Sequence, residues 1–219
     1  KKQMKEQSKR VLIIVSSDIE TNFRNEIYDI QKELDKKPYE RDLLVQCTGQ
    51  EYKMSEDDLK YLSIKQLRRK MRSNINKNYQ FMAYRKLANQ IKRQTNWNGD
   101  ETLITEKVKN IIKRIYSNRV IIIDEVQNIR DESEVDKMIP PIIEAMVKYS
   151  DNVKLIIMSA TPMYHSPREI VYILNLMLSV DKRPPIKEED IFDKDDNITE
   201  KGRKILIETS KGYISYLKG

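Results

Sequence analysis

The chain has 219 residues, of which 39% are hydrophobic and 34% are charged, and its formal net charge is +7. This length allows one sizeable core, whereas the charge content and the lack of an apolar run of roughly 20 residues exclude a membrane-spanning helix. The single cysteine, Cys47, argues against a disulfide framework and fits a reducing, cytoplasmic compartment. The excess of positive charge is a mild indication of a polyanionic partner.

Strands and helices alternate in the first part of the chain. Residues 10–17, RVLIIVSS, form a β-branched run typical of a strand buried on both faces. Apolar residues at helical spacing predict a helix over 19–34, and DLLVQCTG at 42–49 predicts a second strand. Residues 51–78 are polar and predicted to be partly helical, and YQFMAY at 79–84 predicts a third strand.

The alternation continues through the middle of the chain. Helical patterns cover residues 85–93 and 106–116, and the next aliphatic run, at 120–123, predicts a buried strand. A helix over 135–149 is expected to be interrupted near Pro140 and Pro141.

The last part adds a strand over 153–159 and a helix over 168–178. The acidic, proline-containing stretch 181–200 predicts a linker or a surface excursion. Strands that alternate with helices predict an α/β fold with a mostly parallel, open, doubly wound sheet.

Two adjacent carboxylates, Asp124 and Glu125, follow the aliphatic strand 120–123. Ligands of such sheets bind at the carboxyl ends of the strands. There, one carboxylate can hold a Mg²⁺-bound water and a second can polarise an attacking water. An ordinary strand that ends in two solvent-facing acids would look the same. However, Ser159 and Thr161 in MSATPM follow another aliphatic strand, and the two motifs together favour a phosphate-binding site.

The sequence DEVQ followed by SATP resembles motifs II and III of superfamily 2 helicases and related nucleic-acid translocases. VLIIVSS with FRNEI resembles motif Ia and its helix, and CTG at 47–49 resembles motif Ib. IIIDEVQNIR, SATPMYHSPREIVYILNLML and GYISYLKG are most similar to ATPases of large cytoplasmic DNA viruses. These include the poxvirus early-transcription-factor ATPase and nucleoside triphosphate phosphohydrolase, with giant-virus relatives. The resemblance implies a three-layer RecA-like domain over 1–180, beginning at motif Ia. It also implies that 181–219 is a linker with a helical segment that leads toward a second such domain.

The resemblance implies roles in ATP hydrolysis for the DEVQ residues. Asp124 would hold Mg²⁺ through water, and Glu125 would orient and activate the hydrolytic water. Gln127 stands where many relatives have His, and it would hydrogen-bond across to motif III.

The resemblance also implies contacts with nucleic acid, either DNA or RNA. Residues of motif III would couple the nucleotide state to nucleic-acid binding, and residues of motifs Ia and Ib would contact backbone phosphates. The former are Ser159, Ala160 and Thr161, and the latter are Ser16, Ser17, Thr48 and Gly49.

The phosphate-binding pattern G-x-x-x-x-G-K-[ST] does not occur in the sequence. This loop cradles the phosphates and supplies a lysine, and we expect it upstream of Lys1. We expect the arginine finger and second RecA-like domain beyond Gly219. The 219-residue chain alone is therefore expected not to hydrolyse ATP.

Residues 60–93 contain eleven basic residues and no acid, with aromatic residues interleaved. This composition favours a segment that follows a nucleic-acid backbone with occasional stacking, and Arg68, Arg69 and Arg72 are its candidate phosphate contacts. A solvated helix face would have the same composition. Phe81 and Tyr84 are expected in the core.

Three functions remain open from the sequence. The first is the motor domain of a superfamily 2 ATPase in viral transcription or genome handling, in the host cytoplasm or the virion. Its partners would be nucleic acid and the viral transcription machinery, without a membrane. The second is an AAA-type clamp or transposition ATPase, which can also show IIIDEVQN but is not expected to have SATP. The third is a non-catalytic RecA-like interaction module.

Overall fold

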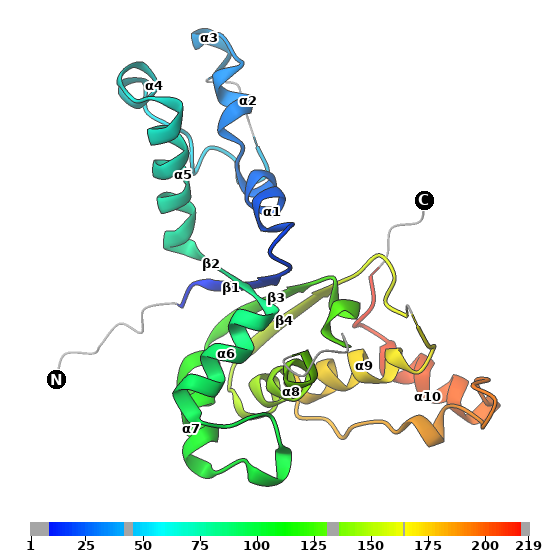
Figure 1. Ribbon diagram of the computed structural model, residues 1–219. Coiled ribbons are helices and arrows are strands. Elements are labelled where there is room, and N and C mark those ends of the chain that lie inside the picture. The colour runs from blue at the N-terminus through cyan, green and yellow to red at the C-terminus, as the bar shows by residue number, and fades with distance from the viewer. Residues whose placement is uncertain (1–8, 42–45, 131–135, 164, 216–219) are drawn as a thin grey trace, which may run out of the picture. The chain divides into compact units, whose positions relative to one another are not determined.

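The computed structural model describes residues 9–41, 46–130, 136–163 and 165–215 (Figure 1). The chain divides into two compact units, Lys1–Ala83 and Tyr84–Gly219, called here the first and the second unit. Each unit contains one pair of parallel strands with helices between them. In the part of the chain that is described, no helix has the length and apolar character needed to cross a membrane.

The first unit is built on β1 (Val11–Val15) and β2 (Tyr79–Ala83). The two strands run parallel, with Val11 opposite Tyr79 and Val15 opposite Ala83. Leu12 through Val15 are fully buried, as expected for an aliphatic run in a parallel sheet. Both strands confirm the predictions at 10–17 and 79–84.

Five helices lie between β1 and β2 in the described residues. They are α1 (Glu20–Ile27), α2 (Ile30–Leu34), α3 (Pro38–Arg41), α4 (Glu56–Tyr61) and α5 (Ile64–Asn78). The single helix predicted over 19–34 is wrong, because the chain is extended at Tyr28. Asp29 then caps α2 by accepting a hydrogen bond from the Gln31 backbone N–H at 2.9 Å.

The strand predicted at 42–49 falls partly outside the described residues, since 42–45 are not among them. Its described end, Gln46 to Gly49, is a tight turn and not a strand. The Gly49 N–H donates to the Gln46 carbonyl at 2.8 Å, and Gly49 has a φ of +66°, which glycine adopts without a steric penalty. The Gln46 side chain bonds both the N–H and the carbonyl of Asp29, so the turn packs on the break between α1 and α2.

The second unit is built on β3 (Arg119–Asp124) and β4 (Val153–Met158), which pair in parallel. Its helical elements are α6 (Tyr84–Thr95), η1 (Glu101–Leu103), α7 (Glu106–Tyr116), η2 (Val126–Arg130), η3 (Asp136–Met138), α8 (Ile139–Tyr149), α9 (Glu169–Val180), η4 (Glu188–Asp190) and α10 (Glu200–Ser210). Parallel strands joined through helices confirm the predicted α/β class and are consistent with a RecA-like fold.

Helix α8 forms the centre of the second unit. It packs against α6, α7 and α9 (Figure 1), and Ile142, Ile143 and Met146 are almost completely buried. The interruption predicted near Pro140 and Pro141 is wrong. The helix begins at Ile139, so both prolines lie in its first turn, where a missing N–H costs no intrahelical hydrogen bond.

The acidic stretch 181–200 packs on α9 within the second unit through its apolar residues. Ile191 and Phe192 are buried and contact Val171 of α9. An antiparallel bridge joins Phe192 to Ile198, and the Thr199 hydroxyl caps α10 by accepting from the Gly202 N–H at 2.9 Å. Most residues of the stretch remain exposed, as expected of a surface excursion. The domain boundary at residue 180 stays a prediction.

Candidate functional site

The parallel pairing of β3 and β4 brings the two chemical motifs to one edge of the strand pair. Asp124 pairs in register with Met158, so Ser159 is the first residue past the end of β4. In β3, Arg119, Ile121 and Ile123 are buried. The strand predicted at 153–159 is only half-buried, because Val153 and Leu155 point into the core whereas Lys154 and Ile156 are exposed. The structure thus brings together Asp124, Glu125 and Ser159, which are far apart in the sequence.

A chain of hydrogen bonds connects the two motifs, and we call it the relay. The Gln127 amide Nε2 donates to the Glu125 carboxylate. The Ser159 hydroxyl donates to Gln127 Oε1 at 2.6 Å, and the Thr161 backbone N–H donates to the Ser159 hydroxyl at 3.0 Å. The Gln127 amide and the Ser159 hydroxyl each donate one hydrogen bond and accept one within the relay. The hydrogen bond expected between Gln127 and motif III is present.

The other two residues of the SAT motif border the relay. The Ala160 and Thr161 side chains are exposed, and only the backbone of Thr161 takes part in the relay. Their surfaces are therefore open to a ligand at this edge.

The carboxylates of Asp124 and Glu125 repel each other. Burial raises the pKa of the Asp124 carboxyl, and the neighbouring charge of Glu125 raises it further, against a smaller opposing hydrogen bond from the Glu125 backbone. A bound cation would relieve this repulsion and lower that pKa again. Such a perturbed acid at the edge of a sheet is typical of a functional site.

The donor set at this edge suits Mg²⁺. No group of three or more histidine, cysteine or acidic side chains converges within the described residues. Mg²⁺ needs no such group, because it keeps several waters and binds proteins through one or two carboxylates plus substrate phosphates. Asp124 and Glu125 supply hard oxygen ligands of the right kind.

One contact at the site was not expected from the sequence. The Tyr84 hydroxyl donates to the backbone carbonyl of Asp124. Tyr84 is buried, as predicted, but as a core aromatic residue it carried no predicted role at the site. No local pattern signals this bond, because its partners are 40 positions apart.

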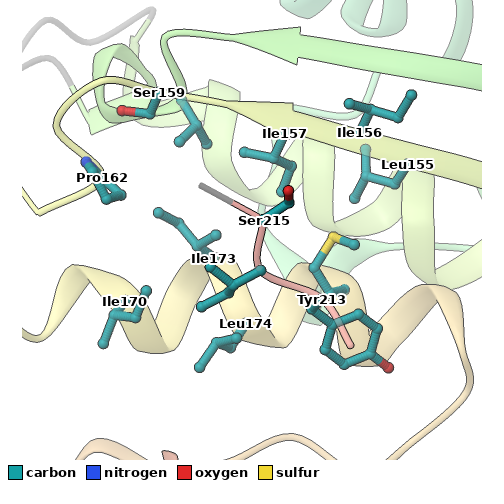
Figure 2. A pocket seen from close by; sticks show the side chains of 13 residues that line it. Leu155, Ile156, Ile157, Ser159, Pro162, Ile170, Ile173, Leu174, Tyr213 and Ser215 are labelled. Atoms are coloured by element: carbon teal, nitrogen blue, oxygen red, sulfur yellow. The ribbon is translucent and has the colours of Figure 1, made fainter. Parts of the chain in front are cut away.

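An apolar groove of about 360 Å³ adjoins the relay (Figure 2). Figure 2 shows it between β4 and α9, with Ser159 at one end and Tyr213 and Ser215 in the space between. The Tyr213 hydroxyl contacts the Asp181 carboxylate and accepts from Arg183 at 3.2 Å, which holds the segment after α10 against the groove.

The residues predicted to contact nucleic acid all belong to the first unit. Ser16 and Ser17 follow the carboxyl end of β1. The Thr48 hydroxyl donates to the Ile27 carbonyl at 2.9 Å, so it stabilises the turn of 46–49 and would have to release this bond to donate to a phosphate. Gly49 completes that turn.

The three candidate arginines of the basic segment 60–93 lie on α5, while the segment itself continues through β2 into α6. Leu67 and Met71 are buried on the inner side of the helix, whereas Arg68, Arg69 and Arg72 are exposed. Asp58 of α4 pairs with Lys70 at 2.5 Å, but no ion pair within the described ranges involves these three arginines. Their charges are therefore available to a polyanion.

Comparison with known proteins finds two distant viral relatives. Both are proteins of Acanthamoeba polyphaga mimivirus with the name "putative ATP-dependent RNA helicase". One is 26% identical over 198 residues, which cover 80% of this chain and 17% of the relative. The other is 25% identical over an alignment of 225 positions, and the alignment covers 96% of this chain and 33% of the relative. This chain thus spans a third or less of either relative. No protein-family model and no solved structure matches the chain.

Proposed function

We propose that the chain is part of a nucleic-acid-dependent ATPase of the superfamily 2 helicase and translocase type, acting in viral transcription or genome handling. The relay from Glu125 through Gln127 to Ser159 is the observation that carries this proposal. It links the candidate hydrolytic residue Glu125, directly after β3, to the SAT motif after β4. A change at the nucleotide could reach the backbone of Thr161 through this link. The names of the two relatives support the helicase class and favour RNA over DNA.

In this proposal Asp124 binds Mg²⁺ through water, and Glu125 orients and deprotonates the water that attacks the γ-phosphate of ATP. When bound, the metal ion neutralises charge on the phosphate oxygens. Gln127 holds the Glu125 carboxylate by donating to one of its oxygens. The other carboxylate oxygen can then accept the proton of the water.

The first unit supplies the proposed contacts with the nucleic-acid backbone. Hydroxyl and amide groups of motifs Ia and Ib would bind phosphates without reading sequence, and the α5 arginines would add a salt-dependent attraction. The motif residues are Ser16, Ser17, Thr48 and Gly49, and the arginines are Arg68, Arg69 and Arg72.

The test is a pair of isosteric variants in the full-length protein. Glu125→Gln removes the base while keeping the shape, so ATP should still bind and turnover should fall by about 10² to 10⁴-fold. Asp124→Asn should instead raise the Mg²⁺ concentration needed for turnover. Steady-state hydrolysis with RNA present, measured beside nucleotide binding, separates these effects.

A matched control is Glu208→Gln on α10, because Glu208 is exposed and far along the chain from the relay. This variant should hydrolyse ATP at the unaltered rate. A turnover of Glu125→Gln within about twofold of the unaltered protein would show that the two acids only end a strand, and would favour a non-catalytic interaction module.

A further inference from the structure

Tyr84 is buried at the start of α6. Its side chain is 6% exposed, and Leu87, Ala88 and Ile91 of the same helix are buried where α6 packs against α7 and α8. The position of the Tyr84 ring is therefore set by the core of the second unit and not by the site.

The Tyr84 hydroxyl meets the backbone on both sides of the Glu125 Cα atom. It donates to the carbonyl oxygen of Asp124, and it lies 3.4 Å from the carbonyl oxygen of Glu125. These two oxygens belong to the peptide planes before and after Glu125. Their relative orientation is defined by the φ and ψ angles of Glu125, so one hydroxyl in contact with both restrains that conformation.

The conformation that Tyr84 restrains is an unusual one. Glu125 has a φ of +55°, in the left-handed region where a residue with a Cβ atom is uncommon and strained. Such strain persists only where the surroundings impose it, and it is concentrated at functional sites.

We propose that Tyr84 is a positioning residue whose hydroxyl holds Glu125 in the left-handed conformation from which its carboxylate joins the relay. The inference rests on the proposed function, because the orientation of Glu125 affects turnover only if Glu125 activates the water. Tyr84 itself touches neither the nucleotide nor the attacking water.

The test is Tyr84→Phe in the full-length protein, which keeps the ring and removes the hydroxyl. We expect kcat for ATP hydrolysis to fall about five- to tenfold, the factor that corresponds to one hydrogen bond, with KM within about twofold. The matched control is Tyr116→Phe. Tyr116 is equally buried, and its hydroxyl has no hydrogen-bond partner among the described residues, so its kcat should not change. An unchanged kcat for Tyr84→Phe overturns the proposal, because Glu125 would then be positioned without the hydroxyl.

A double mutant separates positioning from a general loss of structure. If Tyr84 acts through Glu125, then Tyr84→Phe combined with Glu125→Gln is no slower than Glu125→Gln alone. Losses that multiply overturn the proposal. If Glu125→Gln lowers kcat and Tyr84→Phe leaves kcat unchanged, only the positioning inference fails. If Glu125→Gln is normal, the proposed function fails as well, whatever the rate of Tyr84→Phe.

Discussion

Gly202 allows α10 to approach the backbone of the excursion 181–200, and we expect Gly202→Ala to destabilise the protein. A Cβ atom at this position would lie 2.1 Å from the Ile191 carbonyl oxygen and 2.5 Å from the Ile191 Cα atom. Both are backbone atoms, so no side-chain rotation relieves the clash. The same carbonyl accepts from the Thr199 N–H at 2.9 Å and from the Thr199 hydroxyl at 3.2 Å, and moving it away weakens both hydrogen bonds.

The size of the effect follows from two opposing contributions. Alanine in place of glycine normally stabilises a helix by about 1 kcal/mol. Overpacking typically costs about 1 to 3 kcal/mol, and we place this clash at about 3 kcal/mol because it also strains two hydrogen bonds. The net loss of about 2 kcal/mol corresponds to a decrease in Tm of roughly 4 to 8 °C for a chain of this length.

The measurement is thermal unfolding followed by circular dichroism, with limited trypsin digestion of the excursion as a second readout. Lys204→Ala on an exposed position of α10 is the control, and it should change the free energy of unfolding by less than about 0.5 kcal/mol. A higher Tm for Gly202→Ala, as at an open helix position, would refute the close approach of α10 to Ile191.

Three further predictions concern the site. Ser159→Ala removes the donor to Gln127 and should lower RNA-dependent ATP turnover about tenfold with nucleotide affinity unchanged; equal turnover would show that the relay is dispensable. Replacing the α5 arginines together by glutamine should flatten the plot of log affinity for RNA against log salt by about two to three units, whereas an unchanged slope would leave α5 as a solvated face. These arginines are Arg68, Arg69 and Arg72. The 219-residue chain alone should hydrolyse ATP no faster than buffer, because its sequence lacks a glycine-rich phosphate loop; Mg²⁺-dependent turnover from this chain would contradict that prediction.

The positions of the strands, and much of the site, could be predicted from the sequence. Aliphatic runs predicted β1, β3 and β4, because strands of a parallel sheet are rich in valine, isoleucine and leucine. Full burial on both faces holds for most of β1, whereas Lys154 and Ile156 of β4 are exposed. Since parallel strands present their carboxyl ends at one edge, the acids after β3 and the SAT motif after β4 were expected to meet. The register of Asp124 with Met158 places them as expected.

Local patterns were less informative about where helices begin. The spacing of apolar residues over 19–34 suggested one helix, but the Asp29 side chain caps a new helix start and the chain is extended just before it. The prolines at 140 and 141 suggested an interruption, which is absent because the helix begins at Ile139. In the first case a side-chain cap on a backbone N–H set the helix start, and in the second the prolines lie in the first turn, where no intrahelical N–H is needed.

Only the tertiary structure decided how the Glu125 carboxylate is held. The identities of Glu125 and Gln127 are evident in the sequence, whereas the left-handed backbone of Glu125 and its contact with Tyr84 are not. A hydrophobic pattern records which faces are buried, and it therefore predicts that Tyr84 lies in the core. The direction of a buried hydroxyl depends on how α6 packs on α7 and α8, so its partner, 40 positions away, becomes known only when those helices are in place.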